Sequence, residues 1–276
     1  MVSHKFGGSW TKIKLQALED YLFFYGHALK NQHFNLLYID AFAGTGVCEI
    51  TENKCASVIP GSVQIAIDLE SAFNKLIFID DKKKHIKELE KLCGDHPKTE
   101  IYHDEANKKV QELCNSIDWK ENRAVMFLDP YGLNVEWETL KSIAATQAID
   151  VCFLFSLSGL FRQAARDFSK VDEHKAKALD TCLGTSEWRE YLYNRTGQKD
   201  LFGGEQAPIR DKGVPEMENY VKTRLETIFA AVTKPIRLPQ TGAPLFSLFI
   251  AISNPSLKAI GLAMKVANHT FNKMRL

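Results

Sequence analysis

Residues 36–46 constrain the fold of this chain more than any other stretch. They open with four apolar or aromatic residues and continue with Asp40 and a turn that holds Gly44 and Gly46. A short apolar run of this kind is typical of a strand buried on both faces of a parallel sheet. The glycines let the backbone turn tightly and let a ligand approach main-chain amides. The stretch therefore favours a ligand-binding turn at the end of a buried strand, although Glu49 stands where dinucleotide-binding motifs have a third glycine.

Three further runs typical of strands also end in an acidic residue. They are residues 75–79 before Asp80 and Asp81, residues 101–103 before Asp104, and residues 124–128 before Asp129. The carboxyl ends of parallel strands meet at one edge of an open sheet, and ligands bind there, so we expect these acids to share one crevice. An acid after the second strand binds ribose hydroxyls in such folds, which makes Asp80 the candidate. Asp81 is the alternative, or it caps the next helix.

The last of these runs leads into the tetrad Asp129-Pro130-Tyr131-Gly132. Proline cannot continue a central strand, and it biases the preceding residue to an extended backbone. The tetrad therefore predicts a rigid turn that directs Asp129 and Tyr131 into the crevice. The alternative is an ordinary Asp-Pro-x-Gly turn without a binding role, which proteins use often.

Two of these motifs resemble those of class I methyltransferases, which use S-adenosylmethionine (AdoMet). Asp-x-Phe-x-Gly-x-Gly from Asp40 to Gly46 resembles their motif I. The tetrad at Asp129 resembles motif IV of amino-group methyltransferases, and more closely the Asp-Pro-Phe-Gly of tRNA guanine-N2 dimethyltransferases. The resemblance implies that the glycines hold the amino-acid end of AdoMet, that Asp40 lies near its ammonium and that Asp104 meets its adenine. The cofactor-binding residues it implies are Asp40, Phe42, Gly44, Gly46, Asp80, Asp81 and Asp104.

The residue types in the tetrad suit transfer of a methyl group to an exocyclic amine of a nucleobase. An amino nitrogen conjugated to a purine ring is a poor nucleophile. The Asp129 carboxylate and the Pro130 carbonyl can accept its hydrogens and direct its lone pair at the methyl group, while Tyr131 can stack on a flipped base. These three residues are the predicted catalytic group, and the predicted substrate is a base in RNA or DNA.

Two segments outside these motifs supply candidates for substrate contacts. Thr11 is expected to cap the first helix. Lys14 is predicted near the AdoMet carboxylate or the substrate, against the alternative of a solvated amphipathic helix. Residues 160–205 are predicted to form a charged helical insertion. Its Arg162 and Arg166 would hold phosphates or stack on bases, against the alternative of ordinary helix surface.

The order of the expected elements predicts a single α/β domain over residues 1–276. Alternating strands and helices indicate a mostly parallel, Rossmann-like sheet of seven strands. Two late strands, at residues 235–239 and 244–253, are tightly joined and favour an antiparallel finish. Residues 47–60 are expected to be a polar insertion, and the lysines within residues 82–87 a solvated helix face.

The composition excludes several classes of protein. The formal net charge of +1 gives no overall field that would recruit nucleic acid, so any such surface has to be a local patch. The six cysteines include no Cys-x-x-Cys pair, which favours reduced thiols over a metal site or a disulfide framework, although a Cys48–Cys55 pair is possible. With no signal pattern and no apolar run of about 20 residues, we expect a cytoplasmic protein that does not enter a membrane.

Across most of its length, the chain resembles the three-Cys-motif partner proteins (the TcmP family). The resemblance rests on residues 18–22, 40–46, 61–66, 78–80 and 127–132. It implies a class I methyltransferase fold and a bacterial partner protein with a three-cysteine, radical-AdoMet-like motif, the three cysteines belonging to that partner. The alternative to a methyltransferase is therefore an AdoMet-binding, non-catalytic subunit that positions nucleic acid for this partner.

Overall fold

A computed structural model of the chain describes residues 9–52, 55–194, 207–239 and 243–274. The strands of its central sheet are β1 (Asn35–Asp40), β4 (Lys75–Asp80), β5 (Thr99–His103), β6 (Asn122–Leu128), β7 (Ile149–Phe155), β10 (Ala231–Val232), β11 (Ile236–Leu238) and β12 (Phe246–Ile252). They lie in the order β10–β12–β7–β6–β1–β4–β5, and β11 also pairs with β12.

The direction of the strands confirms the predicted fold class. The strands from β5 to β7 in this order are parallel to one another, and β12 is antiparallel to β7. Because β10 and β11 pair with successive parts of β12, they fill a single position at the edge of the sheet. The sheet thus has seven positions and the antiparallel finish expected from the two late strands.

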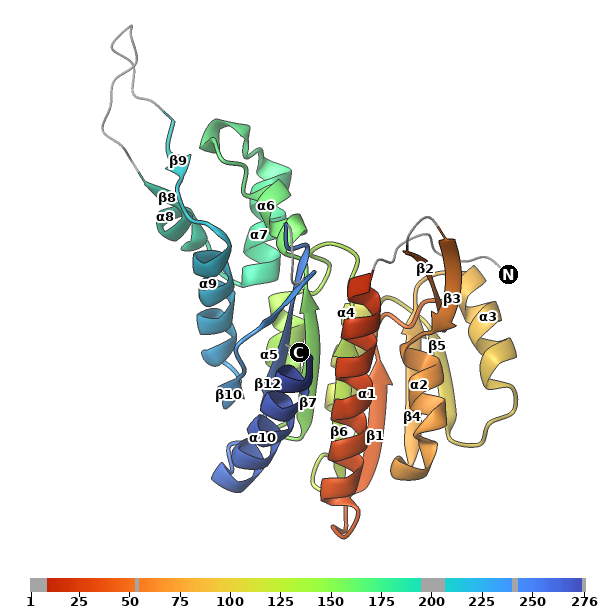
Figure 1. Ribbon diagram of the computed structural model, residues 1–276. Coiled ribbons are helices and arrows are strands. Elements are labelled where there is room, and N and C mark those ends of the chain that lie inside the picture. Colours follow the sequence, from red (N-terminus) through yellow and green to blue (C-terminus); the bar gives the residue numbers. More distant parts are fainter. Residues whose placement is uncertain (1–8, 53–54, 195–206, 240–242, 275–276) are drawn as a thin grey trace, which may run out of the picture.

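Helices cover both faces of the sheet (Figure 1). One face carries α1 (Ser9–Leu29), α2 (Ser62–Asp68), the short η1 (Glu70–Ala72), α3 (Lys83–Cys93) and α10 (Leu257–Met274). The other face carries α4 (Ala106–Ser116), α5 (Trp137–Ala145) and α9 (Val214–Glu226).

Strand alternation explains why the apolar runs of the sequence are continuous. Successive side chains of a strand point to opposite faces of the sheet. In β1, Leu37 and Ile39 join the core shared with α4 and α5, whereas Leu36 and Tyr38 join the core shared with α1 and α10. Every residue of β7 is buried, so both of its faces have to be apolar.

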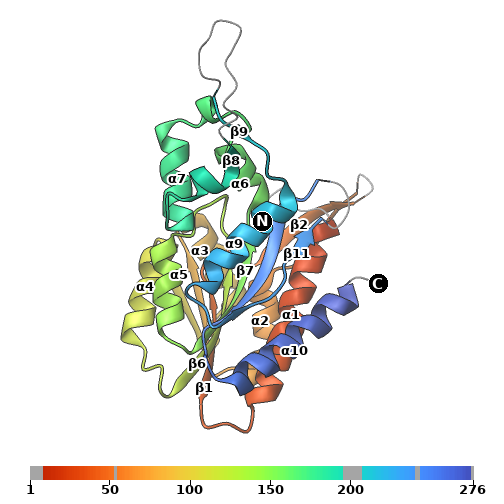
Figure 2. The same cartoon turned by 90° about the vertical axis from the view of Figure 1, so that its left-hand side faces the viewer.

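A helical lobe rises beyond the carboxyl ends of the strands (Figure 2). Its elements are α6 (Leu157–Gln163), η2 (Phe168–Lys170), α7 (Glu173–Leu183), α8 (Trp188–Leu192), and the paired β8 (Tyr193–Asn194) and β9 (Ile209–Arg210). The side chain of Trp188 is fully buried, and its indole N–H donates to Asp180 at 2.7 Å. The lobe occupies the described part of the predicted insertion; residues 195–206 lie outside the described residues.

Two local expectations are wrong. Residues 47–60 form a β-hairpin, β2 (Val47–Glu52) with β3 (Cys55–Pro60), rather than a polar loop. The polar residues of the segment stand within these strands, and Ile50 of β2 is fully buried. Thr11 does not cap α1, because that helix already begins at Ser9 and Thr11 is buried within its first turn.

The expected solvated lysines are confirmed, since Lys82, Lys83, Lys84 and Lys87 are all exposed. Within the described parts of the chain, no helix has the length and apolarity to cross a membrane.

Candidate active site

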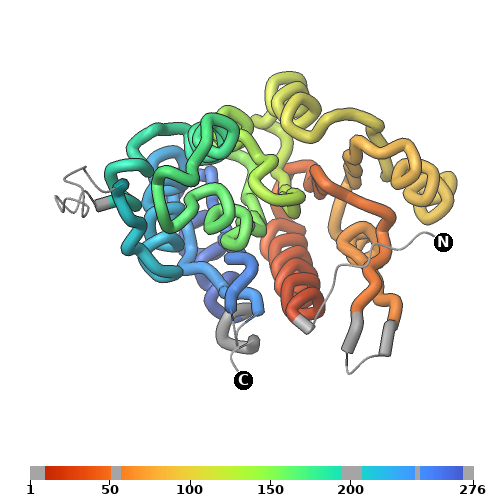
Figure 3. Tube along the Cα trace, turned by 90° about the horizontal axis from the view of Figure 1, so that it is seen from above, coloured from red at the N-terminus to blue at the C-terminus, as the bar shows by residue number. Residues whose placement is uncertain are grey.

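The sheet brings the ends of four strands together at one edge. Asp40, the last residue of β1, lies opposite Phe127 of β6 on one side and Phe78 of β4 on the other, and Asp80 lies opposite His103 of β5. Neighbouring strands are about 4.8 Å apart, so acids that follow adjacent strands share one surface. Figure 3 looks down on this edge, with the first turns of α1 between the lobe and the β2–β3 hairpin.

The Asp129 carboxylate forms a mostly buried ion pair with Lys14. The Lys14 Nζ lies 2.6 Å from Asp129 Oδ2, and the two side chains are 8% and 26% exposed. Burial alone would lower the pKa of Lys14, but the charge and hydrogen bond of Asp129, with smaller effects of Cys48 and Asp40, raise it above its ordinary value. Lys14 is therefore charged at neutral pH, and the first turns of α1 are tied to the turn after β6.

Asp40 stabilises the start of the turn that holds Gly44 and Gly46, which is called the glycine turn below. Its side chain is fully buried and accepts hydrogen bonds from the Tyr38 hydroxyl at 3.3 Å, the Phe42 N–H at 3.2 Å and Ser62. Burial raises the pKa of Asp40 to about 6, although these hydrogen bonds oppose the rise. Because its carboxyl is fully buried and accepts these protein hydrogen bonds, Asp40 stabilises the conformation of the turn.

The turn itself has the left-handed backbone that glycine favours. Gly44 has φ +65° and Gly46 has φ +79°. A Cβ added at Gly44 would meet no atom within 4 Å, so the backbone there borders open space. A Cβ added at Gly61 would lie 2.7 Å from the Gly46 carbonyl oxygen, which also accepts the Gly61 N–H at 2.9 Å. The close approach of these two backbone segments requires glycine at position 61.

Asp80 connects the glycine turn to the next helix. Its Oδ2 accepts the Gly44 N–H at 2.9 Å, and its Oδ1 accepts the Lys82 N–H at 2.8 Å. The His85 Nδ1 lies 2.8 Å from the same Oδ1. Asp81 makes no side-chain cap at the start of α3 and is exposed. Asp80 thus supports the backbone of the turn at Gly44, and Asp81 presents an open carboxylate; which of the two binds ribose hydroxyls stays a prediction.

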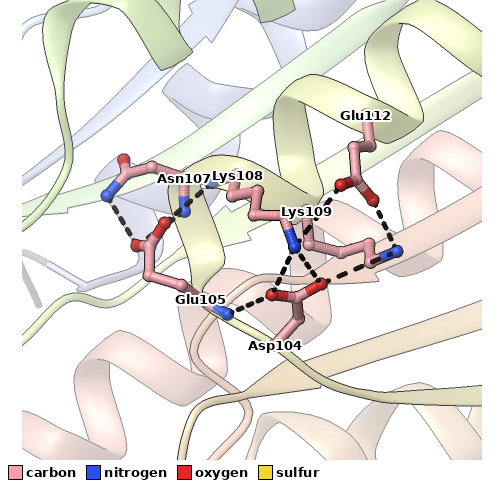
Figure 4. A network of polar contacts seen from close by, with 6 residues as sticks. All are labelled: Asp104, Glu105, Asn107, Lys108, Lys109 and Glu112. Atoms are coloured by element: carbon pink, nitrogen blue, oxygen red, sulfur yellow. Dashed lines mark hydrogen bonds and ion pairs between the residues drawn. The ribbon is translucent and has the colours of Figure 1, made fainter.

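The end of β5 carries a network of polar contacts (Figure 4). Asp104 is half-buried, and Lys108 and Lys109 lie 3.3 and 3.9 Å from its carboxylate. The Glu105 N–H and Lys108 hold the pKa of Asp104 below its usual value, against the opposing effect of burial. Glu105 caps α4 by accepting the N–H groups of Asn107 and Lys108. Asp104 therefore lies at the same edge, but with cations already beside it.

Asn107 is a positioning residue to which the sequence analysis gave no role. Its Nδ2 donates to Glu105 and to the Asn134 carbonyl at 2.9 Å each, and its Oδ1 accepts from the Glu136 N–H and the Thr139 hydroxyl at 3.0 Å each. These bonds join the loop after β5 to the loop after β6. The sequence indicates this role only weakly, by the position of Asn107 three residues after Asp104 at the end of β5.

The turn after β6 presents an aromatic ring to solvent. Pro130 is buried, Gly132 has φ +67°, and the side chain of Tyr131 is 74% exposed. A buried proline beside an exposed tyrosine fits the predicted rigid turn. The ring is free to stack on a planar ligand.

The two predicted arginines lie on the lobe, away from this cluster. Arg162 and Arg166 are both exposed. Arg210, which the sequence analysis did not single out, lies over the Phe161 ring at 4.6 Å and donates to two backbone carbonyls, so it supports the lobe. Asp129 pairs with Lys14 rather than with either of these arginines, and the predicted role of Arg162 and Arg166 stays a prediction.

Comparison with known proteins supports the fold and leaves the finer identity open. No protein-family model and no curated protein sequence matches the chain. Among solved structures, a protein of the family-model DUF519 from Legionella pneumophila str. Philadelphia 1 is similar at 14% identity, over 98% of this chain and 94% of that one, with a TM-score of 0.50.

Two methyltransferases are also similar, at lower scores. A dimethyladenosine transferase from Plasmodium falciparum matches 88% of this chain and 62% of its own at 13% identity and a TM-score of 0.41. An S-adenosylmethionine-dependent methyltransferase from Clostridium acetobutylicum matches 85% and 91% at 10% identity and a TM-score of 0.38. Likeness at these identities concerns the fold. The chain has a Rossmann-like fold, with the strand order and antiparallel finish described above.

Proposed function

We propose that the chain is an AdoMet-dependent methyltransferase that acts on an exocyclic amine of a nucleobase in RNA or DNA. The observation that carries the proposal is the placement of the Asp129-Pro130-Tyr131 turn beside the glycine turn of β1, at one edge of the sheet. An acceptor for amine hydrogens, an exposed ring for stacking and a backbone open to a ligand are thereby adjacent.

The residues at this edge fit the chemistry of AdoMet. The cofactor carries a sulfonium, an ammonium and a carboxylate at one end, and ribose hydroxyls and adenine at the other. Around the glycine turn lie the carboxyls of Asp40, Asp80 and Asp129, with the buried ammonium of Lys14 among them. The negative charges surround the turn with a field that suits a cationic ligand, and the Lys14 ammonium could meet the cofactor's carboxylate.

Individual roles follow from which groups are open. Gly44 and Gly46 would border the amino-acid end, with Lys14 near the carboxylate. We assign the ribose contact to Asp81, because both oxygens of Asp80 already accept protein hydrogen bonds. Phe42 is half-buried in the same turn and offers apolar surface, and Asp104 would lie toward the adenine.

Asp129 is the residue we propose to orient the target amine. Its Oδ2 already accepts from a primary ammonium at 2.6 Å, which is the kind of donor that a base amine presents. Tyr131 would stack on the flipped base. Arg162 and Arg166 on the lobe would contact the phosphates.

Two measurements test this function. Isothermal titration should show saturable AdoMet binding without NAD binding; absence of AdoMet binding ends the proposal. Transfer of a tritiated methyl group from AdoMet should then be assayed on total RNA, DNA and protein. Asp129→Asn should keep AdoMet affinity within about threefold and lose transfer by at least about 100-fold, because positioned acid–base groups contribute about 10²- to 10⁴-fold. Asp118→Asn, on the opposite side of the domain, is the matched control and should leave transfer unchanged.

The Lys14–Asp129 ion pair supports one rival function. If Asp129 remains engaged with Lys14, the chain would bind AdoMet without transferring its methyl group, as a subunit of a three-Cys-motif, radical-AdoMet-like protein in a bacterial cytoplasm. Methyl incorporation that appears only when this partner is present, together with co-purification of the two proteins, would favour the subunit. Transfer by the chain alone would rule it out.

A further inference from the structure

A cavity lies at the amino end of the sheet, away from the carboxyl ends of the strands discussed above. Its volume is about 300 Å³, and it opens between α1 and α10 at the amino end of the sheet, where β7 begins. The two helices pack side by side on the same face (Figures 1 and 2). The cavity is within the size range of small-molecule sites, and it is unrelated to the cofactor edge.

One wall of this cavity holds a buried acid. Asp150 is the second residue of β7 and is 9% exposed. Its Oδ2 accepts from the Tyr21 hydroxyl at 2.9 Å. Among the described residues, no lysine, arginine or histidine forms an ion pair with it. A buried carboxyl without a cation is costly to keep charged, and burial raises the pKa of Asp150 to about 7.

The other walls are mainly apolar and aromatic. Helix α1 contributes Tyr21, Tyr25 and Ala28, with the two tyrosine rings stacked at 6.2 Å between centroids. Helix α10 contributes small residues that include Ala259 and Ala263. The lining thus combines one acidic group and a few polar and cationic residues with mainly apolar walls, which is the usual composition of a small-ligand site.

The two cations near the cavity do not neutralise Asp150. Arg123 lies over the Phe34 ring at 3.7 Å, and its NH1 donates to the Trp119 and Asn122 carbonyls at 2.7 Å each. Lys258 is exposed, in the first turn of α10. Asp150 therefore lines the cavity without an ionic partner among the described residues, although Arg123 and the exposed Lys258 also line it.

We propose that this cavity binds a small apolar primary ammonium compound whose head group pairs with Asp150. An ammonium offers three hydrogen-bond donors and a positive charge that can pair with the Asp150 carboxylate. The half-buried ring of Tyr25 suits a cation and an apolar chain alike. An alkyl or aralkyl group of six to eight carbons would lie against the alanines of α1 and α10.

Calorimetric titration of the full chain with phenethylammonium tests the proposal. The neutral 2-phenylethanol and the anionic 3-phenylpropionate are the ligand controls. The ammonium should bind at least about tenfold more tightly than the alcohol, because a hydrogen bond to a charged group contributes about 1.5–3 kcal/mol, or about 10- to 100-fold. The anion should bind more weakly than both.

Three variants separate the proposed pairing from general effects. Asp150→Asn keeps an acceptor for Tyr21 and should lose the preference for the ammonium over the alcohol. Asp68→Asn, an exposed acid on α2, is matched in charge change and should bind as the wild type does. Ala259→Phe fills the cavity and should abolish binding of both ligands while Asp150 is intact. Equal affinity for ammonium and alcohol, equal losses in both aspartate variants, or undiminished binding in Ala259→Phe would each overturn the proposal.

Discussion

Replacing Lys14 by methionine tests the ion pair at the centre of the candidate site. Methionine retains most of the apolar stem and removes the ammonium, which leaves the Asp129 carboxylate without the partner that now lies at 2.6 Å. Removing one member of a fully buried pair costs about 3–5 kcal/mol. Because the Asp129 side chain is 26% exposed, water can reach it, and we expect a smaller loss of unfolding free energy, about 1–3 kcal/mol.

The loss should be measured by urea unfolding at pH 7, in a double-mutant cycle with Asp129→Asn. The double variant should recover part of the loss, with a coupling energy of about 1–2 kcal/mol, because its asparagine needs no cation. Lys84→Met, at an exposed position of α3, is the matched control and should stay within about 0.5 kcal/mol of the wild type.

The pH dependence of the same pair has a definite sign. The pKa of Lys14 is raised in the folded protein, so its contribution is complete below the ordinary lysine value of 10.5 and is lost as pH rises through the higher folded value. The difference between wild type and Lys14→Met should therefore be constant near neutral pH and shrink in strong alkali. An unchanged urea midpoint in Lys14→Met, or the same loss with and without Asp129, would refute the pairing.

Two further predictions concern other parts of the chain. Gly61→Ala should lower the unfolding free energy by about 1–3 kcal/mol and weaken AdoMet binding, because its Cβ would lie 2.7 Å from the Gly46 carbonyl oxygen; Gly261→Ala, which meets no atom within 4 Å in α10, should instead gain up to about 1 kcal/mol by urea unfolding. Equal effects of the two substitutions would contradict the described approach of the turn. The pKa of Asp150 is raised to about 7, so the folded state binds more protons than the unfolded state between about pH 4 and pH 7, and the protein loses stability as pH rises through that window. Asp150→Asn should therefore gain stability relative to the wild type on going from pH 4 to pH 8, as thermal unfolding would show, and a gap independent of pH would contradict the assigned environment.

The sheet was predictable from the sequence because its determinants are local. Strands β1, β4, β6 and β7 contain continuous apolar runs, and an acid ends or follows β1, β4, β5 and β6, so strand positions and the shared edge follow without knowledge of the tertiary structure. The segment between the two late strands is short and contains prolines. A parallel pair needs a much longer crossover connection, so an antiparallel arrangement was the one to expect.

What could not be predicted depends on contacts between distant residues. Lys14 and Asp129 are 115 residues apart, so no pattern within either segment reveals their pairing. The sequence places two adjacent acids after β4 but does not show which one supports Gly44, 36 residues away. The β2–β3 hairpin was mistaken for a loop because five polar residues fall within residues 49–54 and interrupt the apolar pattern of the strands, while the burial of Ile50 depends on the tertiary structure.

The coupling energy of the Lys14–Asp129 pair also bears on the choice between the two proposed functions. If Asp129 has to accept hydrogens from a base amine, the amine displaces or shares the ammonium of Lys14. A coupling of about 1–2 kcal/mol would then weaken substrate binding by about 5- to 30-fold, which a catalytic site can tolerate. A coupling of about 5 kcal/mol would correspond to a penalty of several thousandfold, and Asp129 would stay with Lys14 under any realistic substrate concentration. The double-mutant cycle thus measures the free energy needed to release Asp129 from Lys14, and it can do so before any substrate has been identified.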